Sequence, residues 1–178
     1  SSIRMIFFTR LFTLWFVFFA KRKREQILAS NQFITRSHFF TLILPDEEKD
    51  FLASLKIIDH LLQQKKEVTI VLNNAKAHYI HQKYSIREIE YYQTDKNKLG
   101  LPVKKFREQL ASLRSDVVMD LSRGESYFHI SAAYCIKAKY VIGFEKPDSD
   151  KFYSIQLRIN ESTPEISYKN FLNCIQMF

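Results

Sequence analysis

Residues 116–144 read DVVMDLSRGESYFHISAAYCIKAKYVIGF, and this stretch decides the fold class. Two short apolar runs, DVVMDL at 116–121 and KYVIGF at 139–144, flank a segment of helical character at 126–137. Such runs are typical of strands that are buried on both faces of a sheet. A strand, a helix and a second strand in this order predict two parallel strands joined by a crossover helix.

The same alternation extends in both directions along the chain. Upstream, the sequence predicts strands at 39–44, 67–72 and 87–92, helices at 50–64 and around His78, and a helix opened by Pro102. Downstream, it predicts a strand at 152–159 and a helix at 166–178. This order predicts an α/β, Rossmann-like parallel sheet with helices on both faces. Its central strands are expected at 41–44, 68–72, 117–121 and 140–143. The expected core comprises Leu42, Ile43, Ile58, Leu62, Ile70, Val118, Met119, Ala132, Val141 and Ile142.

A chain of 178 residues has room for one ordinary domain and an appendage. No linker rich in Gly, Pro or Ser interrupts the alternating elements after His38. We therefore expect a single Rossmann-like domain at 38–178, preceded by an apolar and basic arm at 1–37.

The arm contains the apolar run MIFFTRLFTLWFVFFA at 5–20, which is followed directly by four basic residues. As a helix it would be about 24 Å long, shorter than the hydrocarbon core of about 30 Å. We expect a helix lying in the interface of an anionic membrane, with the chain held peripherally at the cytoplasmic face of the inner membrane. The expected contacts are Arg10, Trp15, Lys21, Arg22, Lys23 and Arg24. A signal peptide, or a helix packed on its own domain or on a second copy of the chain, is the alternative.

The distribution of charge supports a membrane partner over nucleic acid. Residues 1–40 hold seven Lys and Arg against the single acid Glu25, a net +6, so residues 41–178 carry only the remaining +2 of the chain's +8. A nucleic-acid-binding domain usually spreads its basic residues along one face of the folded body. We therefore expect no nucleic-acid partner.

The sequence predicts neither a metal site nor a cofactor. Cys135 and Cys174 have no Cys or His nearby at ligand spacing, so reduced, buried thiols are expected. His78 and His81 are three residues apart but lack a third ligand in the sequence. The chain also lacks the Gly-x-Gly-x-x-Gly fingerprint and the P-loop pattern, which argues against the usual nicotinamide, flavin and ATP sites.

Candidate chemistry lies in the turns after the first and fourth strands, because ligands bind at the carboxyl ends of parallel strands. The first turn reads PDEEKD at 45–50 and the second reads DLSRGES at 120–126. The candidate residues are Asp46, Lys49, Asp50, Ser122 and Arg123. The structural alternative is that Asp46 or Glu47 favours the first turn of the following helix, and that Ser126 caps the helix after a simple strand-to-helix turn.

Four pieces of the chain match a known protein family in their order and spacing. They read LILPDEEKDFLASLKIIDHL, EVTIVLNN, DVVMDLSRGESYFHISAAYCIKAK and YVIGF. With them, the chain resembles the N-terminal domain of glycosyltransferase family 9, the lipopolysaccharide heptosyltransferases of GT-B fold. The resemblance rests on order and spacing, and VIGF is its most distinctive piece. Lys49 stands where the family has a glycine, so a side chain fills space that the glycine leaves free.

The resemblance implies an acceptor-side domain acting at a membrane surface in the assembly of lipopolysaccharide or cell-envelope glycan. It places Asp50 on the family's candidate general base, with Asp46, Lys49, Ser122 and Arg123 around the acceptor, a sugar or lipid-linked sugar. GT-B enzymes bind the donor chiefly through a C-terminal domain, so a partner domain or a homodimer is implied and the chain alone is expected to be inactive. A non-catalytic, membrane-associated binding or scaffold protein of the same fold is the alternative, and the sequence leaves both open.

Overall fold

The computed structural model describes residues 32–124, 126–158 and 163–178. The predicted apolar helix and its expected membrane contacts, Arg10, Trp15, Lys21, Arg22, Lys23 and Arg24, lie outside the described residues. Within the described ranges, no helix combines the length and the apolar character needed to cross a membrane.

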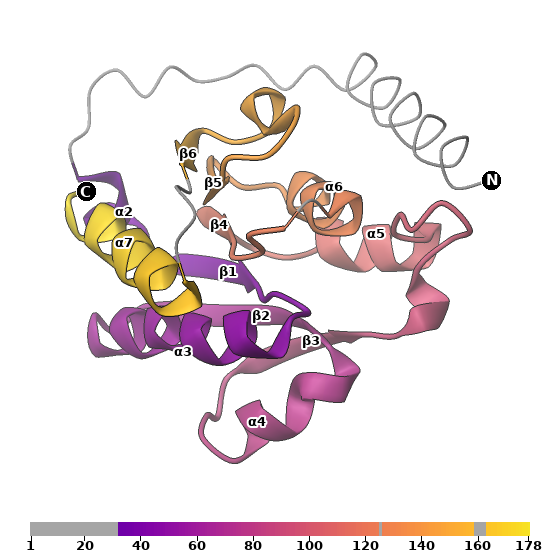
Figure 1. The fold of residues 1–178 in the computed structure, drawn as a ribbon, viewed down its shortest axis with the longest axis horizontal. Helices are drawn as coiled ribbons and strands as arrows, with labels where there is room; N and C mark the ends of the chain where they lie inside the picture. Colours follow the sequence, from indigo (N-terminus) through magenta and orange to yellow (C-terminus); the bar gives the residue numbers. More distant parts are fainter. Residues whose placement is uncertain (1–31, 125, 159–162) are drawn as a thin grey trace.

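The body of the domain is a six-stranded sheet in which every pair of neighbouring strands is parallel (Figure 1). The strand order is β3-β2-β1-β4-β5-β6. The strands are β1 (Phe39–Ile43), β2 (Glu67–Asn73), β3 (Arg87–Tyr91), β4 (Val117–Asp120), β5 (Tyr140–Phe144) and β6 (Ile155–Leu157). The four strands expected at the centre are the four inner strands, so the predicted Rossmann-like sheet is confirmed.

Helices cover both faces of this sheet, as predicted. The described helices are α2 (Phe33–Arg36), α3 (Glu48–Gln63), α4 (Ala77–His81), α5 (Lys104–Ala111), α6 (Tyr127–Cys135) and α7 (Pro164–Gln176), with 3-10 turns η1 (Asn74–Lys76), η2 (Gln93–Asp95) and η3 (Ser149–Lys151). One apolar core lies between the sheet and α3, α4 and α7, and a second lies between the sheet and α5 and α6. Figure 1 shows α3 and α7 side by side on the first of these faces.

The predicted core residues are buried with one exception. Leu62 is half-buried, whereas its neighbours Ile57 and Leu61 on the same helix are fully covered. The helix α3 packs against α7 as well as against the sheet. The buried face of α3 therefore includes Ile57 and Leu61, whereas Leu62 lies at the margin of this face. The spacing of apolar residues in the sequence did not reveal this orientation of the helix.

Three predicted boundaries and one predicted burial also differ from the structure. The helix after Pro102 begins at Lys104, so the proline precedes its N-cap, Val103. The sixth strand, expected at 152–159, covers Ile155–Leu157 among the described residues of that range. The helix expected at 126–137 ends at Cys135. Cys135 and Cys174 are only half-buried, whereas burial was expected.

The packed body includes residues that precede the expected domain start at His38. Phe33 and Ile34 of α2 are buried in the first core. The ring of Phe33 lies 4.4 Å from that of Tyr140 and 5.2 Å from that of Phe178, measured between centroids. Residues 33–36 therefore pack with the sheet domain. The division of the chain into an arm at 1–37 and a domain at 38–178 otherwise stays a prediction, because residues 1–31 lie outside the described residues.

The glycine of the YVIGF run has a packing role. A Cβ atom at Gly143 would lie 2.5 Å from Cε2 of Tyr153, closer than real Cβ contacts allow. Tyr153 is itself buried, and its hydroxyl donates a hydrogen bond to Asp120 on the neighbouring strand. Gly143 thus leaves the space that this ring occupies over β5.

We predict that Gly143→Ala lowers the free energy of unfolding by about 1–3 kcal/mol, the usual cost of overpacking a core. Gly124→Ala is the matched control, because a Cβ there would meet nothing within 4 Å, and it should change stability by less than about 0.5 kcal/mol. Urea unfolding of both variants measures the difference. A loss of stability in Gly143→Ala as small as that in Gly124→Ala would show that the ring of Tyr153 moves without cost.

Candidate functional site

The order of the strands creates a switch point between β1 and β4. From β1 the chain continues to β2 on one side, and from β4 it continues to β5 on the other. In open parallel sheets this reversal leaves a crevice beyond the carboxyl ends of the two strands, where ligands bind. The turns that follow β1 and β4 are the two turns that the sequence singled out.

Two predicted residues, one from each turn, meet at this point. Nε and Nη2 of Arg123 lie 2.9 and 2.8 Å from Oδ1 of Asp50 in the first turn of α3. Nη1 of Arg123 donates to Oγ of Ser167 on α7 at 3.1 Å. Both members of the ion pair are largely buried, with side-chain exposures of 10% for Asp50 and 19% for Arg123. The guanidinium therefore fixes the position of the candidate base and links α3, the turn after β4 and α7.

Asp46 lies in a second polar cluster at the same edge of the sheet. Its Oδ1 accepts hydrogen bonds from the hydroxyl of Tyr91 and, at 3.3 Å, from the amide of Asn73. Its Oδ2 lies 3.6 Å from the ammonium of Lys96. Burial by itself would raise the pKa of Asp46, but the Tyr91 hydroxyl, the Lys96 ammonium and the Asn73 amide favour the charged carboxylate, and this pKa lies below its ordinary value. Asp46 is therefore a charged, partly exposed acceptor of hydrogen bonds.

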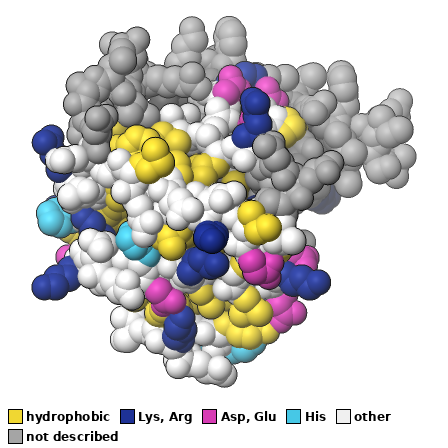
Figure 2. All heavy atoms as spheres, turned by 60° about the vertical axis from the view of Figure 1, so that its left-hand side comes forward, with side chains coloured by type: hydrophobic (Ala, Val, Ile, Leu, Met, Phe, Trp, Pro, Cys, Tyr) yellow, Lys and Arg dark blue, Asp and Glu magenta, His cyan; other side chains and the backbone are white. Residues whose placement is uncertain are grey.

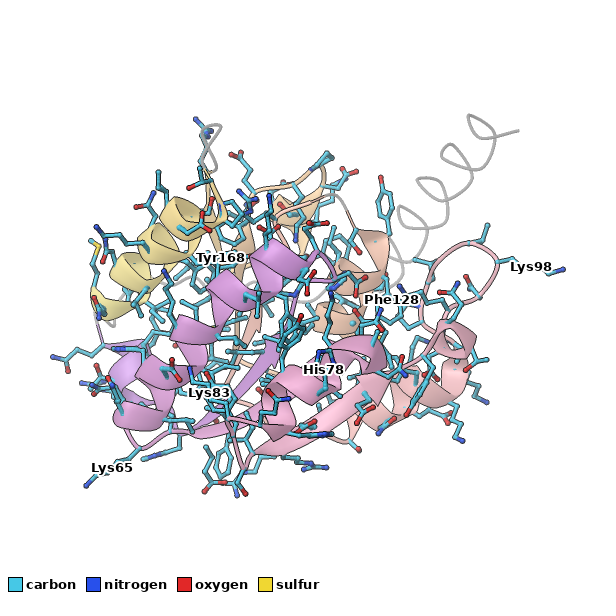
Figure 3. The ribbon with its side chains drawn as sticks, turned by 60° about the horizontal axis from the view of Figure 1, so that its bottom comes forward. Lys65, His78, Lys83, Lys98, Phe128 and Tyr168 are labelled. Carbon is cyan, nitrogen blue, oxygen red and sulfur yellow. The ribbon has the colours of Figure 1, made fainter. Side chains whose placement is uncertain are left out.

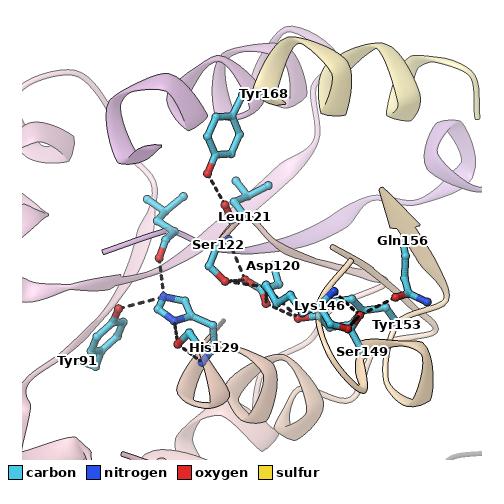
Figure 4. A network of polar contacts seen from close by, with 12 residues as sticks. Tyr91, Asp120, Leu121, Ser122, His129, Lys146, Ser149, Tyr153, Gln156 and Tyr168 are labelled. Atoms are coloured by element: carbon cyan, nitrogen blue, oxygen red, sulfur yellow. Dashed lines mark hydrogen bonds and ion pairs between the residues drawn. The ribbon is translucent and has the colours of Figure 1, made fainter. Parts of the chain in front are cut away.

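Beneath these groups lies a buried ion pair, shown in Figure 4. Nζ of Lys146, in the turn after β5, lies 2.8 Å from Oδ2 of Asp120 at the end of β4, and the two side chains are 1% and 0% exposed. Oδ1 of Asp120 accepts from the backbone N–H and hydroxyl of Ser122 at 3.0 and 2.7 Å. The Tyr153 hydroxyl donates to Oδ2. Burial by itself would raise the pKa of Asp120, but the charge of Lys146 and the hydrogen bonds from Lys146 and Ser122 together lower this pKa, so the carboxylate is ionised.

His129 joins α6 to the turn after β1. Its Nε2 lies 3.1 Å from the carbonyl oxygen of Leu44, which can only accept, and its Nδ1 lies 2.6 Å from Oγ of Ser126. These partners fit a neutral imidazole with its proton on Nε2, which donates to Leu44 while Nδ1 accepts from the Ser126 hydroxyl. Burial lowers the pKa of His129, in keeping with the neutral form.

The structure brings some of the predicted site residues together and separates others. Asp50 and Arg123 form one pair, and Asp46 follows the same strand as Asp50. Lys49 is exposed on the first turn of α3. Ser122 is buried, and its hydroxyl is bonded to Asp120 and to Lys146. Their proposed roles toward an acceptor stay predictions.

The alternative of helix capping has two outcomes. Glu47 is the N-cap residue of α3 but makes no side-chain capping bond, and Asp46 is bonded to Tyr91. The favourable effect of their charges on the first turn of α3 stays a prediction. Capping by Ser126 is confirmed, because its hydroxyl accepts the backbone N–H of His129 at 3.3 Å.

Four residues of the network were missed from the sequence: Tyr91, His129, Lys146 and Tyr153. His129 is three residues after the recognisable N-cap Ser126, and this spacing was the signal available for it. Tyr91 reads as an ordinary strand residue, and Lys146 as a surface lysine in a turn. Their roles depend on contacts between residues far apart in the sequence.

Two hollows in the surface lie away from the switch point. One of about 460 Å³ lies between α5 and α6 and is lined by Lys104, Arg107, Glu108, Ala111, Tyr134, Cys135 and Lys137. The other, of about 430 Å³, lies at the amino ends of β1, β4 and β5, where Arg36, His38, Arg114 and Lys139 are among its lining residues. Neither hollow includes Asp46, Asp50 or Arg123. The carboxyl edge of the sheet therefore remains the candidate site on chemical grounds.

The groups at this edge suit a neutral polar ligand with several hydroxyls. Asp46 and Asp50 accept hydrogen bonds, Arg123 and Lys96 donate them, and a carboxylate at this edge can take the proton of an attacking hydroxyl.

Comparison with known proteins supports the same fold. No family model and no curated protein matches the chain. Among solved structures, the chain is similar to the glycosyl transferase family 9 protein from Veillonella parvula DSM 2008, with a TM-score of 0.60 and 16% sequence identity. The match covers 84% of this chain and 44% of that one, so the chain spans less than half the length of its neighbour. The chain has a fold like that of glycosyltransferase family 9, in keeping with the resemblance seen in the sequence.

We predict that Lys146→Met lowers the free energy of unfolding by about 3–5 kcal/mol, because it leaves the Asp120 carboxylate buried and unpaired. Lys151→Met is the control: Lys151 forms an ion pair with Asp148 at 2.8 Å but is 37% exposed, and its loss should cost at most about 1 kcal/mol. Chemical unfolding distinguishes the two variants. Similar losses would mean that Asp120 finds another partner.

The burial of His129 predicts a loss of stability in acid. The unfolded chain binds a proton at this imidazole near about pH 6.5, whereas the folded chain binds it at lower pH because burial lowers the pKa of His129. Its contribution is therefore present above about pH 6.5 and is lost as the pH falls toward the folded-state pKa.

Unfolding free energies of the wild type and of His129→Gln, measured at about pH 7.5 and about pH 5.5, test this expectation. The wild type should lose more stability between the two conditions. His60, whose pKa burial also lowers, is present in both proteins and cancels in the comparison. Parallel losses would contradict a neutral, buried His129.

Proposed function

We propose that the chain is the acceptor-side half of a glycosyltransferase that acts in lipopolysaccharide or cell-envelope glycan assembly. The observation that carries this proposal is the meeting of Asp50 and Arg123 at the switch point of a fold like that of glycosyltransferase family 9. A sugar acceptor offers hydroxyls to this edge. The donor is contributed by a further domain or by a partner chain, so residues 1–178 alone transfer no sugar.

Each residue at the edge has a role in this proposal. Asp50 accepts the proton of the attacking acceptor hydroxyl, and Arg123 holds the carboxylate of Asp50 in position. Asp46 and Lys49 bind acceptor hydroxyls beside it. Ser122 positions the turn through its bonds to Asp120 and Lys146.

The proposed place of action is the cytoplasmic face of the inner membrane, where a lipid-linked acceptor would be reached. The support for it is the apolar run at 5–20 with the basic residues at 21–24. On the face of the described part that Figure 2 shows, basic and acidic side chains are interspersed. The proposed membrane contact therefore rests on the arm.

A non-catalytic binding or scaffold protein of the same fold is the second candidate. The ion pair of Asp50 with Arg123 favours it, because it joins three elements and occupies the carboxylate. In this case Asp50 stabilises the domain and takes no proton.

Acceptor binding tests the site that the first candidate requires. We predict that the deacylated core oligosaccharide of lipopolysaccharide binds the ¹⁵N-labelled chain and shifts the amide resonances of residues 46–50 and 121–124. Asp46→Asn should weaken this binding about tenfold, because a hydrogen bond to a charged group contributes about 1.5–3 kcal/mol.

Asp59→Asn is the control, since Asp59 is an exposed carboxylate elsewhere on α3, paired with Lys83 at 2.8 Å. Shifts confined to other surfaces, or absent altogether, would remove the acceptor site from this edge. Where a donor-binding partner is supplied, Asp50→Asn should slow transfer by about 10²–10⁴-fold if Asp50 is the base. Unchanged transfer, with a loss of stability only, would favour the scaffold.

A further inference from the structure

A group of metal-binding side chains lies at the outer edge of the sheet, away from the site described above. His81 ends α4, and Glu88 and Glu90 belong to the edge strand β3. One ligand atom from each of the three lies within 4.8 Å of the others. Nε2 of His81 is 3.0 Å from Oε2 of Glu88.

The fold determines why the two glutamates are together. Glu88 and Glu90 are alternate residues of one strand, so their side chains point to the same face of the sheet. They pair in register with Ile70 and Leu72 of β2, whose side chains belong to the core beneath α3 and α4. The carboxylates therefore extend from the edge of an apolar face, and α4 places His81 next to them.

Two carboxylates in this position need positive charge nearby. The side chain of Glu88 is only 15% exposed, and it shares its strand face with a second carboxylate. The carboxylate oxygens of Glu88 and Glu90 lie within 4.8 Å of each other. Like charges this close repel each other, and more strongly where water is partly excluded. His81 can offset one of them, and the hydroxyl of Tyr92 donates to Glu90 at 3.3 Å. A divalent cation would neutralise both.

We propose that His81, Glu88 and Glu90 bind a divalent transition-metal ion, with zinc favoured. One imidazole nitrogen and two carboxylate oxygens form a ligand set that zinc accepts, and water completes a four-coordinate site. Ligand atoms in such a site are about 3.3 Å apart, given bond lengths of about 2.0–2.2 Å. The three ligand atoms, which lie within 4.8 Å of one another, would have to move closer together to bind the ion. This movement is possible because His81 is 59% exposed and its side chain can turn. The ion would tie the end of α4 to the edge strand.

The proposed site uses His81 without His78, although the sequence, which predicted no metal site, offered the two only as a pair without a third ligand. His78, labelled in Figure 3, packs its ring on that of Tyr79 with the centroids 4.0 Å apart. The two histidines lie on the same short helix, and the metal-binding group includes His81 alone. His78 is therefore a matched control for zinc binding by surface histidines in general.

The test is calorimetric titration of the chain, freed of metal with EDTA, with zinc chloride. We expect one zinc per chain and a rise in Tm on addition of zinc, since an ion that binds the folded state stabilises it. His81→Ala and Glu88→Gln should each weaken binding at least tenfold and abolish the rise in Tm. His78→Ala should leave the affinity within about twofold, a change of less than about 0.5 kcal/mol.

A second pair of measurements guards against misfolded variants. Glu90→Gln should also weaken zinc binding, and circular dichroism should show wild-type helix content in each variant. Magnesium chloride should give no comparable heat, because magnesium prefers an octahedral shell of oxygens. Equal losses in His78→Ala and His81→Ala, or wild-type affinity in Glu88→Gln and Glu90→Gln, would overturn the proposal.

Discussion

The ion pair between Asp120 and Lys146 is the constraint on which the candidate site depends. Taking both charges out of water costs several kcal/mol for each, and the pair persists only if every bonding position is filled. Ser122 and Tyr153 fill those of Asp120. The arrangement joins the end of β4 to the turn after β5, and it needs the space over Gly143 for the tyrosine ring. A packing requirement and an electrostatic one are thus met by the same few residues.

This network also decides which polar groups remain for a ligand. Ser122, Lys146 and Tyr153 are engaged below the surface, and His129 is neutral and bonded to the backbone of Leu44. The groups nearer to solvent are Asp46, Asp50 and Arg123. The buried layer therefore supports the turns after β1 and β4 from below. Such support holds functional side chains in place, because their own positions then depend on rigid neighbours.

Tyr91 and the two glutamates of β3 use opposite faces of the sheet. Tyr91 points toward α6 and bonds to Asp46, whereas Glu88 and Glu90 point to the face of α3 and α4. The alternation of side chains along one strand separates them. The proposed metal site and the part of the proposed acceptor site around Asp46 can therefore be changed independently, although both involve β3.

The sequence by itself determined the class of the fold and the places where chemistry could occur. Runs such as EVTIVL and YVIGF are too apolar for a solvent-facing sheet, and their alternation with helices permits little besides a parallel sheet covered on both faces. That architecture directs attention to the turns after the strands, where Asp46, Asp50 and Arg123 do lie. Only the tertiary structure decided which residues meet: Asp50 with Arg123, Asp120 with Lys146, and His81 with Glu88. Local sequence patterns report the period and burial of one element, whereas these contacts depend on how separate elements are placed side by side. The burial of Lys146 shows the difference, because a lysine in a turn reads as a surface residue until the fold places a carboxylate 2.8 Å from its ammonium group.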